Sequence, residues 1–290
     1  MPQDTELKDM LAQFSRLMDQ AERLLPAPMP APDWSAPAHR WHREGHLSPV
    51  HEIAPLALDD LLHIERQKTL LVRNTRQFLK HLPANNVLLW GARGTGKSSL
   101  MRALLNEFRE DGLRIIQVDG QDLTHLPDIA KPLAGRPERF ILLADDLSFE
   151  ASDPGYKALK AMLDGSLEGT PENVLIHATS NRRHLMPEKM MDNLEVKRVD
   201  DEIHPGEAVE EKISLSERFG LWLAFHPFTQ DQYLAVVDHW LTRLGGTMTE
   251  ESRAEALRYA LGRGSRSGRV AWQFAKDWAG RKGLEVRSGN

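Results

Sequence analysis

The octapeptide at residues 91–98 constrains the fold of this chain more than any other feature. It reads Gly91-Ala92-Arg93-Gly94-Thr95-Gly96-Lys97-Ser98 and fits the pattern G-x-x-x-x-G-K-[ST]. An apolar run at 87–90 precedes it, and apolar residues at helical spacing follow it from Leu100 to Phe108. The sequence therefore predicts a strand, a glycine-rich loop and a helix in direct succession.

A loop of this kind binds phosphate groups. Its glycines let the backbone curl so that several N–H groups point at one anion, and the start of the helix adds a partial positive charge. We expect Lys97 to reach the β- and γ-phosphates and Ser98 to place its hydroxyl on Mg²⁺. Residues 91–99, Ser99 included, then form the phosphate-binding surface. The alternative is an ordinary glycine-rich turn that enters a helix.

Four further apolar runs predict a parallel sheet. They lie at 115–118, 140–143, 174–176 and 221–225, and segments with helical character separate them. Continuous apolar strands that alternate with helices are typical of a sheet covered on both faces. The expected class is therefore α/β, with a parallel sheet at its centre.

Two adjacent carboxylates, Asp145 and Asp146, follow the run at 140–143. In a protein with a phosphate loop, an acidic residue at the end of a neighbouring strand holds Mg²⁺ through water. We expect Asp145 to take this metal-side position and Asp146 to polarise the attacking water as general base. The alternative is that the pair only ends a strand and caps the next turn.

The regions on either side of the sheet have different character. Apolar spacing predicts an amphipathic helix over residues 4–25, and five prolines between positions 26 and 37 then favour an extended tether. Four histidines at 39–51 have no recognised metal-ligand spacing, so ordinary loop packing is favoured over a metal site. A long helix is expected at 57–81.

The last 60 or so residues read as a small helical module. Thr229 and Gln232 form a capping box at the start of one helix, and two more helices are expected at 249–262 and 268–280. The predicted domains are an N-terminal helix and linker at 1–38, an α/β nucleotide-binding domain at 39–226 and a helical lid at 227–290.

Composition excludes several classes of function. The 290 residues include no cysteine, which excludes disulfides, thiolate zinc sites and cysteine nucleophiles. The net charge of −5 gives no support to a binder of nucleic acid over its whole surface. The N-terminus does not read as a signal peptide, and no apolar stretch approaches the ~18 residues that span a bilayer. We expect a soluble cytoplasmic protein with no membrane partner.

With both motifs placed, the chain resembles the AAA+ ATPases over residues 57–280. More closely, it resembles a bacterial AAA+-like family, domain of unknown function family 815, in five stretches: WGARGTGKSS, RFILLADDLSFE, ATSNRRHL, EEKISLSERFGLWLAF and RGSRSGRVAWQFA. The resemblance implies a five-stranded parallel sheet in the order 5-1-4-3-2 with a C-terminal helical lid. It also implies ATP as the nucleotide, with Mg²⁺.

The resemblance further implies site residues. Asn181, at the end of the fourth strand, takes the position that senses the γ-phosphate, with a plain turn residue as the alternative. Arg218 matches the arginine that reaches the ATP of a neighbouring subunit, which implies a homo-oligomer; a surface salt bridge to nearby glutamates is the alternative. The lid arginine is Arg269, with Arg266 as the competitor. Apart from the resemblance, we expect Ile64, near the start of the long helix, to line the base pocket.

One departure from the family pattern affects the expected rate of ATP hydrolysis. Many AAA+ enzymes have Asp-Glu where this chain has Asp145-Asp146, and the shorter Asp146 is expected to slow hydrolysis. Glu150 would need a bent backbone to replace it. Three functions compete: an ATPase that acts on an unknown protein or nucleic-acid-associated client, a slowly hydrolysing nucleotide-gated interaction or loader module, and a small-molecule kinase, which the helical module and Arg218 disfavour.

Overall fold

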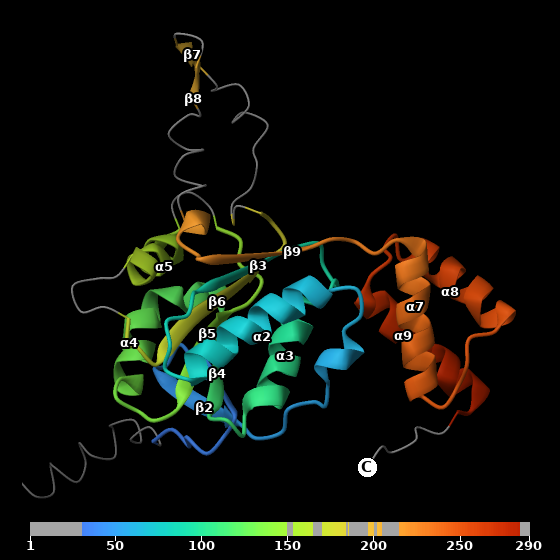
Figure 1. Ribbon diagram of the computed structural model, residues 1–290, viewed down its shortest axis with the longest axis horizontal. Coiled ribbons are helices and arrows are strands. Elements are labelled where there is room, and N and C mark those ends of the chain that lie inside the picture. The colour runs from blue at the N-terminus through green and yellow to red at the C-terminus, as the bar shows by residue number, and fades with distance from the viewer. Residues whose placement is uncertain are drawn as a thin grey trace, which may run out of the picture. The chain divides into compact units, whose positions relative to one another are not determined.

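The computed structural model describes residues 31–149, 153–164, 170–183, 185, 197–199, 202–204 and 215–284 (Figure 1). The amphipathic helix predicted at 4–25, most of the proline-rich tether, Glu150 and His184 lie outside these ranges. The elements in chain order are β1 (Ala38–His42), β2 (His46–Val50), η1 (Leu58–Asp60), α2 (Glu65–Leu79), β3 (Val87–Gly91), α3 (Lys97–Phe108), β4 (Leu113–Val118), η2 (Gly120–His125), α4 (Leu126–Ala130), η3 (Lys131–Leu133), β5 (Arg139–Ala144), α5 (Pro154–Asp164), β6 (Val174–Ser180), β7 (Lys197–Val199), β8 (Glu202–His204), β9 (Leu221–Phe225), α7 (Gln230–Arg243), α8 (Glu250–Gly262) and α9 (Gly268–Lys282).

All five predicted strands are present in one mostly parallel sheet. The order of that sheet is β2-β1-β4-β5-β6-β3-β9. Strands β3, β4, β5, β6 and β9 pair in parallel, and in chain order they are the first to fifth of the predicted strands, so their spatial order is 5-1-4-3-2. The expected strand order is therefore confirmed, but the expected number of five strands is wrong, because the sheet has seven.

The two extra strands form a hairpin at residues 38–50, where ordinary loop packing was expected. Strand β1 runs antiparallel to β2 and parallel to β4, which attaches the hairpin to the sheet. Trp41 and Leu47 point into the core from the two strands. The histidine rings of His42 and His46 stack with centroids 4.5 Å apart. Among the described residues, no group of three or more His, Cys, Asp and Glu could hold a metal ion.

Helices cover both faces of the sheet, as its apolar strands require. One face packs against α2 and α3, which cross the sheet together in Figure 1. The other face packs against η2, α4 and α5. Alternate residues of one strand serve the two faces: Leu89 belongs to the first core and Leu88 to the second.

The helix expected at 57–81 begins eight residues later than predicted. Residues Leu58–Asp60 form a 3₁₀ turn, and His63 then adopts a left-handed backbone with φ of 63° before α2 starts at Glu65. The leucines at 58, 61 and 62 share the helical spacing that misled the prediction. In the structure Leu58 and Leu61 pack on the sheet core, whereas Leu62 packs against the C-terminal helices.

The C-terminal helices pack around a third core, and the three helices predicted in this part of the chain are present. Helices α7, α8 and α9 are grouped together beyond the segment that follows β9 (Figure 1). The capping box at Thr229 is present: the Thr229 hydroxyl accepts from the Gln232 N–H at 3.2 Å, and the Gln232 side chain accepts from the Thr229 N–H at 2.9 Å. In the described part of the chain, no helix is long and apolar enough to cross a membrane.

His177 in the middle of β6 gives the fold a pH dependence. Its side chain is fully buried, and neither ring nitrogen has a hydrogen-bond partner among the described residues. Burial lowers the pKa of His177 to about 3, from 6.5. Between these values the unfolded chain binds a proton that the folded chain does not, so the stability present above pH 6.5 decreases as the pH falls.

We expect His177→Leu to remove part of this dependence. One group that titrates only in the unfolded state costs about 1.4 kcal/mol of stability per pH unit. The free energy of unfolding, measured in urea from pH 7 to pH 5, should therefore fall less steeply in His177→Leu than in the original chain. Equal slopes for the two proteins would contradict the assignment.

Candidate functional site

The glycine-rich loop at residues 91–98, the predicted phosphate loop, joins β3 to α3, as the sequence predicts. Its three glycines, Gly91, Gly94 and Gly96, all have positive φ, at 138°, 77° and 108°. Such values are strained for any residue with a Cβ atom, which explains why the loop needs glycine at these positions. Gly96 is the N-cap of α3, so the loop ends at the positive end of the helix.

Lys97 is folded onto the loop that it follows. Its ammonium donates to the carbonyls of Gly91 at 2.7 Å and Ala92 at 2.9 Å, and to the side-chain oxygen of Asn181 at 3.1 Å. Burial lowers the pKa of Lys97, and the nearby carboxylates of Asp146 and Asp145 oppose that effect. The ammonium is thus a desolvated cation held inside the ring of the loop.

Asp145 shares one oxygen between two hydroxyl groups. Ser98 donates to Asp145 Oδ1 at 2.9 Å, and Thr179 donates to the same atom at 2.5 Å. Ser98 comes from the start of α3, Asp145 follows β5 and Thr179 lies near the end of β6, so three neighbouring elements converge here. The sequence predicted the first two of these residues and missed Thr179. A signal existed, because neighbouring parallel strands end at the same edge of a sheet.

Asp146 is held by its backbone and its carboxylate. Its φ of 54° is left-handed, a conformation that Asp and Asn adopt more readily than Glu. Its N–H donates to the Thr179 hydroxyl at 2.9 Å, and its carboxylate accepts from the Asn181 side chain. The guanidinium of Arg93 is 3.7 Å from its other oxygen. The backbone conformation gives a physical reason for aspartate at this position.

A cavity of about 1120 Å³ opens over the loop and reaches the lid. Its polar end is lined by Arg93, Lys97, Ser98, Asp145, Asp146 and Asn181. Its apolar end is lined by Leu61, Leu62, Ile64, Val236, Trp240 and Trp272. The rest of the loop from Gly94 to Ser99 also lines the wall, whereas Gly91 and Ala92 contribute the carbonyls that hold Lys97. The cavity therefore combines a charged end with an apolar end.

The lid contacts the core beside this cavity. The Arg269 N–H donates to the Gly94 carbonyl at 3.3 Å, and Arg269 lines the cavity. Asp60, almost fully buried, accepts from the Ala57 N–H at 2.9 Å and pairs with His239 at 3.1 Å and Arg243 at 3.0 Å, both on α7. Asp60, Arg243 and the two tryptophans are site features that the sequence analysis missed.

The other arginines named from the sequence lie elsewhere. Arg218 is partly exposed and its guanidinium pairs with Asp164 at the end of α5; it does not line the cavity. Arg266 is exposed, and its carbonyl accepts from the Phe228 N–H. Of the pair considered for the lid arginine, Arg269 is the one that the structure places at the cavity. Arg182 and Arg183 are exposed, and Arg183 lies over the Trp90 ring.

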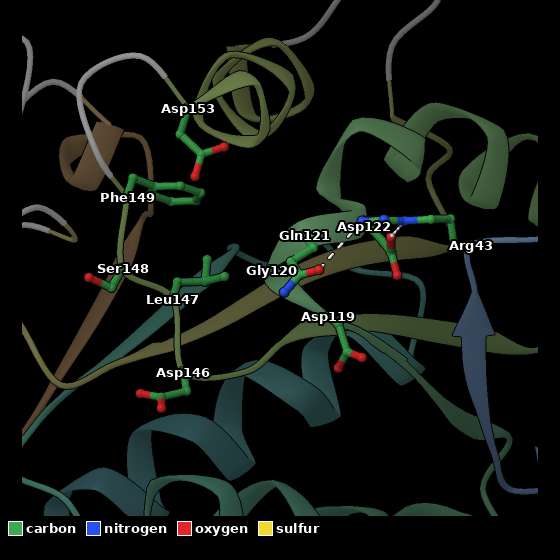
Figure 2. Close-up of a pocket in the computed structure, with 10 residues that line it drawn as sticks. All are labelled: Arg43, Asp119, Gly120, Gln121, Asp122, Asp146, Leu147, Ser148, Phe149 and Asp153. Carbon is green, nitrogen blue, oxygen red and sulfur yellow. Dashed lines mark hydrogen bonds and ion pairs between the residues drawn. The ribbon is translucent and has the colours of Figure 1, made fainter.

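A second, smaller cavity of about 430 Å³ adjoins Asp146 on its other side. Figure 2 shows Asp146 at one end of this cavity and Asp119, Asp122 and Asp153 along it. Arg43 reaches in from the turn of the hairpin, and its guanidinium donates to Asp122 at 3.1 Å. Asp146 is therefore accessible from two cavities.

The mostly parallel sheet and the C-terminal helices give this domain an AAA+-like fold. A RuvB variant from Thermotoga maritima has the same fold, with a TM-score of 0.53 and 16% identity over 81% of this chain and 70% of that chain. The ORC1 protein of Aeropyrum pernix in complex with DNA has a TM-score of 0.52 and 18% identity, over 78% and 62% of the two chains. The AAA domain of FIGL-1 in complex with ADP has a TM-score of 0.51 and 16% identity, over 79% and 74%.

The chain belongs to the family of proteins of unknown function DUF815, whose model matches residues 34–282. Both resemblances noted from the sequence are thereby confirmed. The replication factor C large subunit of Ignicoccus hospitalis is 30% identical over 122 residues. That stretch covers 38% of this chain but only 25% of the replication factor subunit.

Proposed function

We propose that this protein binds ATP in the cavity between the phosphate loop and the lid, and hydrolyses it slowly. The observation that carries the proposal is the position of Lys97: a desolvated ammonium inside a glycine ring, at the start of a helix and beside the carboxylates of Asp145 and Asp146. The triphosphate would occupy the charged end, where backbone N–H groups and Lys97 meet it. The base would occupy the apolar end, against Ile64 and the lid tryptophans.

The residues at the loop fit Mg²⁺. The Ser98 hydroxyl and the Asp145 carboxylate offer hard oxygen ligands 2.9 Å apart at the start of α3, and Thr179 fixes the orientation of Asp145. When bound, the ion would neutralise charge on the phosphate oxygens. Asp146 would accept the proton of the attacking water, and Asn181 would contact the γ-phosphate while it holds Asp146. Arg269 would approach the nucleotide from the lid.

Slow turnover is part of the proposal. The carboxylate of Asp146 is one methylene shorter than the glutamate of many AAA+ enzymes, and Asn181 and Arg93 already engage it. These contacts favour a role in which the bound nucleotide, more than rapid turnover, sets the state that a partner recognises. The client would be a protein, or a complex associated with nucleic acid, that detects the position of the lid.

A homo-oligomer is the third element of the proposal. Arg218 lies away from the cavity of its own chain, in an ion pair with Asp164. To act on ATP it would have to reach the cavity of a second copy, so its role in catalysis requires assembly. The fold likeness to the AAA domain of FIGL-1, whose structure holds ADP, supports an adenine nucleotide as the ligand.

Asp146→Asn tests the proposal. Asparagine keeps the shape and tolerates the left-handed backbone, but it removes the base. Phosphate release should fall about a hundredfold or more, while ATP still binds with near-original affinity. We would measure phosphate release and calorimetric ATP binding on the same preparation. Asp128→Asn, an exposed aspartate on α4, serves as the control, and an unchanged rate in Asp146→Asn would contradict the role.

A further inference from the structure

Arg93 occupies a loop position for which the phosphate-binding pattern requires no particular side chain. Its side chain is 77% exposed and extends over the charged end of the cavity. The nearest carboxylate oxygen is that of Asp146, whose side chain is 61% exposed, and Arg93 Nη2 lies 3.7 Å from it. A pair this exposed is weak and easily exchanged for a better partner.

A triphosphate in the cavity would supply that partner. Asp146 is linked through Asn181 to Lys97, the ammonium that would contact the γ-phosphate, so the two anions would lie near each other. Their repulsion would oppose binding unless a cation lay between them. Arginine has five donors in a planar fork and no acceptor, so one guanidinium can contact a carboxylate and a phosphate together.

We propose that Arg93 binds the terminal phosphate of the triphosphate within its own chain and bridges it to Asp146. The inference rests on the proposed ATP site and deepens it, because it names the residue that distinguishes a triphosphate from a diphosphate. The diphosphate lacks the group that Arg93 would contact. Discrimination between the two nucleotides then belongs to the single chain and does not require Arg218 of a second copy.

The test compares the affinities of two probes for the full chain, by calorimetry with Mg²⁺: ADP and the non-hydrolysable β,γ-imido analogue of ATP. In Arg93→Ala, affinity for the analogue should fall about tenfold to a hundredfold, while affinity for ADP stays within about twofold. Arg93→Lys keeps the positive charge but loses the planar fork of donors, so it should restore only part of the affinity for the analogue. Thermal unfolding of each variant verifies the fold.

Arg102→Ala is the matched control, because Arg102 lines the same cavity from α3. It should change both affinities by a similar factor.

In the Asp146→Asn background, Arg93→Ala should still weaken binding of the analogue. If Arg93→Ala left the affinity for the analogue unchanged in that background, the claim that Arg93 contacts the phosphate directly would be overturned. An equal loss for both probes, or no loss for either, would overturn the inference and leave the ATP site standing. If the original chain binds neither probe, the proposed function fails and the inference fails with it.

Discussion

Lys97→Ala should weaken binding of ATP with Mg²⁺ by about a hundredfold or more and reduce phosphate release to background. The ammonium is the cation at the centre of the loop, and it is partly desolvated, so its charge acts on a phosphate with little screening by water. Each hydrogen bond to a charged group contributes about 1.5–3 kcal/mol, and two phosphates would share this donor. Calorimetry measures the affinity, and a coupled phosphate assay measures the turnover.

The fold should survive this change. Lys97 donates only to neutral carbonyl and amide oxygens, so alanine removes the ammonium and leaves no buried charge behind. Lys80→Ala, at the exposed C-cap of α2, is the control and should bind ATP as the original chain does. A folded Lys97→Ala protein that still binds ATP at full affinity would remove the basis of the nucleotide assignment.

Gly91→Ala should prevent stable folding of the domain. A Cβ atom on Gly91 would lie 1.9 Å from the carbonyl oxygen of Phe225 and 2.8 Å from its carbonyl carbon, and φ is 138°. Both contacts are with the backbone of β9, which pairs with β3 in this register, so no side-chain rotation relieves them. We expect a loss of more than about 3 kcal/mol in the free energy of unfolding, measured in urea.

Gly112→Ala separates the clash from the backbone strain. Gly112 also has a positive φ, at 90°, but a Cβ atom there would meet nothing within 4 Å. Alanine at 112 should therefore cost only about 1–2 kcal/mol, from the left-handed backbone alone. If the two variants lost equal stability, the close approach of β9 to the phosphate loop would not be the reason for glycine at position 91.

The parts of the fold that the sequence predicted are those with strong local patterns. Five apolar runs became five strands, and the capping box at Thr229 marked the start of α7. The hairpin at 38–50 was missed because five of its thirteen positions are histidine or arginine, which conceals the alternation of buried His39 and Trp41 with exposed Arg40. The start of α2 was misplaced because the left-handed backbone of His63 interrupts the helical pattern. No glycine or proline marks that position in the sequence.

In the site as in the fold, residues within a local sequence pattern could be predicted, and contacts between distant segments could not. Residues within one motif, from Gly91 to Ser99, could be named from spacing alone. The contact of Thr179 with Asp145 depends on the register between β5 and β6; the shared sheet edge could be predicted from the sequence, but this register could not. The contacts of Asp60 join residues 179 positions apart in the chain, at His239, so only the folded structure brings them together.

The two contacts between lid and core described above restrict how the lid can move. Asp60 holds α7 through two side chains, and the Gly94 carbonyl holds the start of α9 through one N–H. Two fixed points define an axis. We expect rotation about the line from Asp60 to Gly94 to keep both contacts and sliding of the C-terminal helices to break them, so a hinged swing is the motion that we predict.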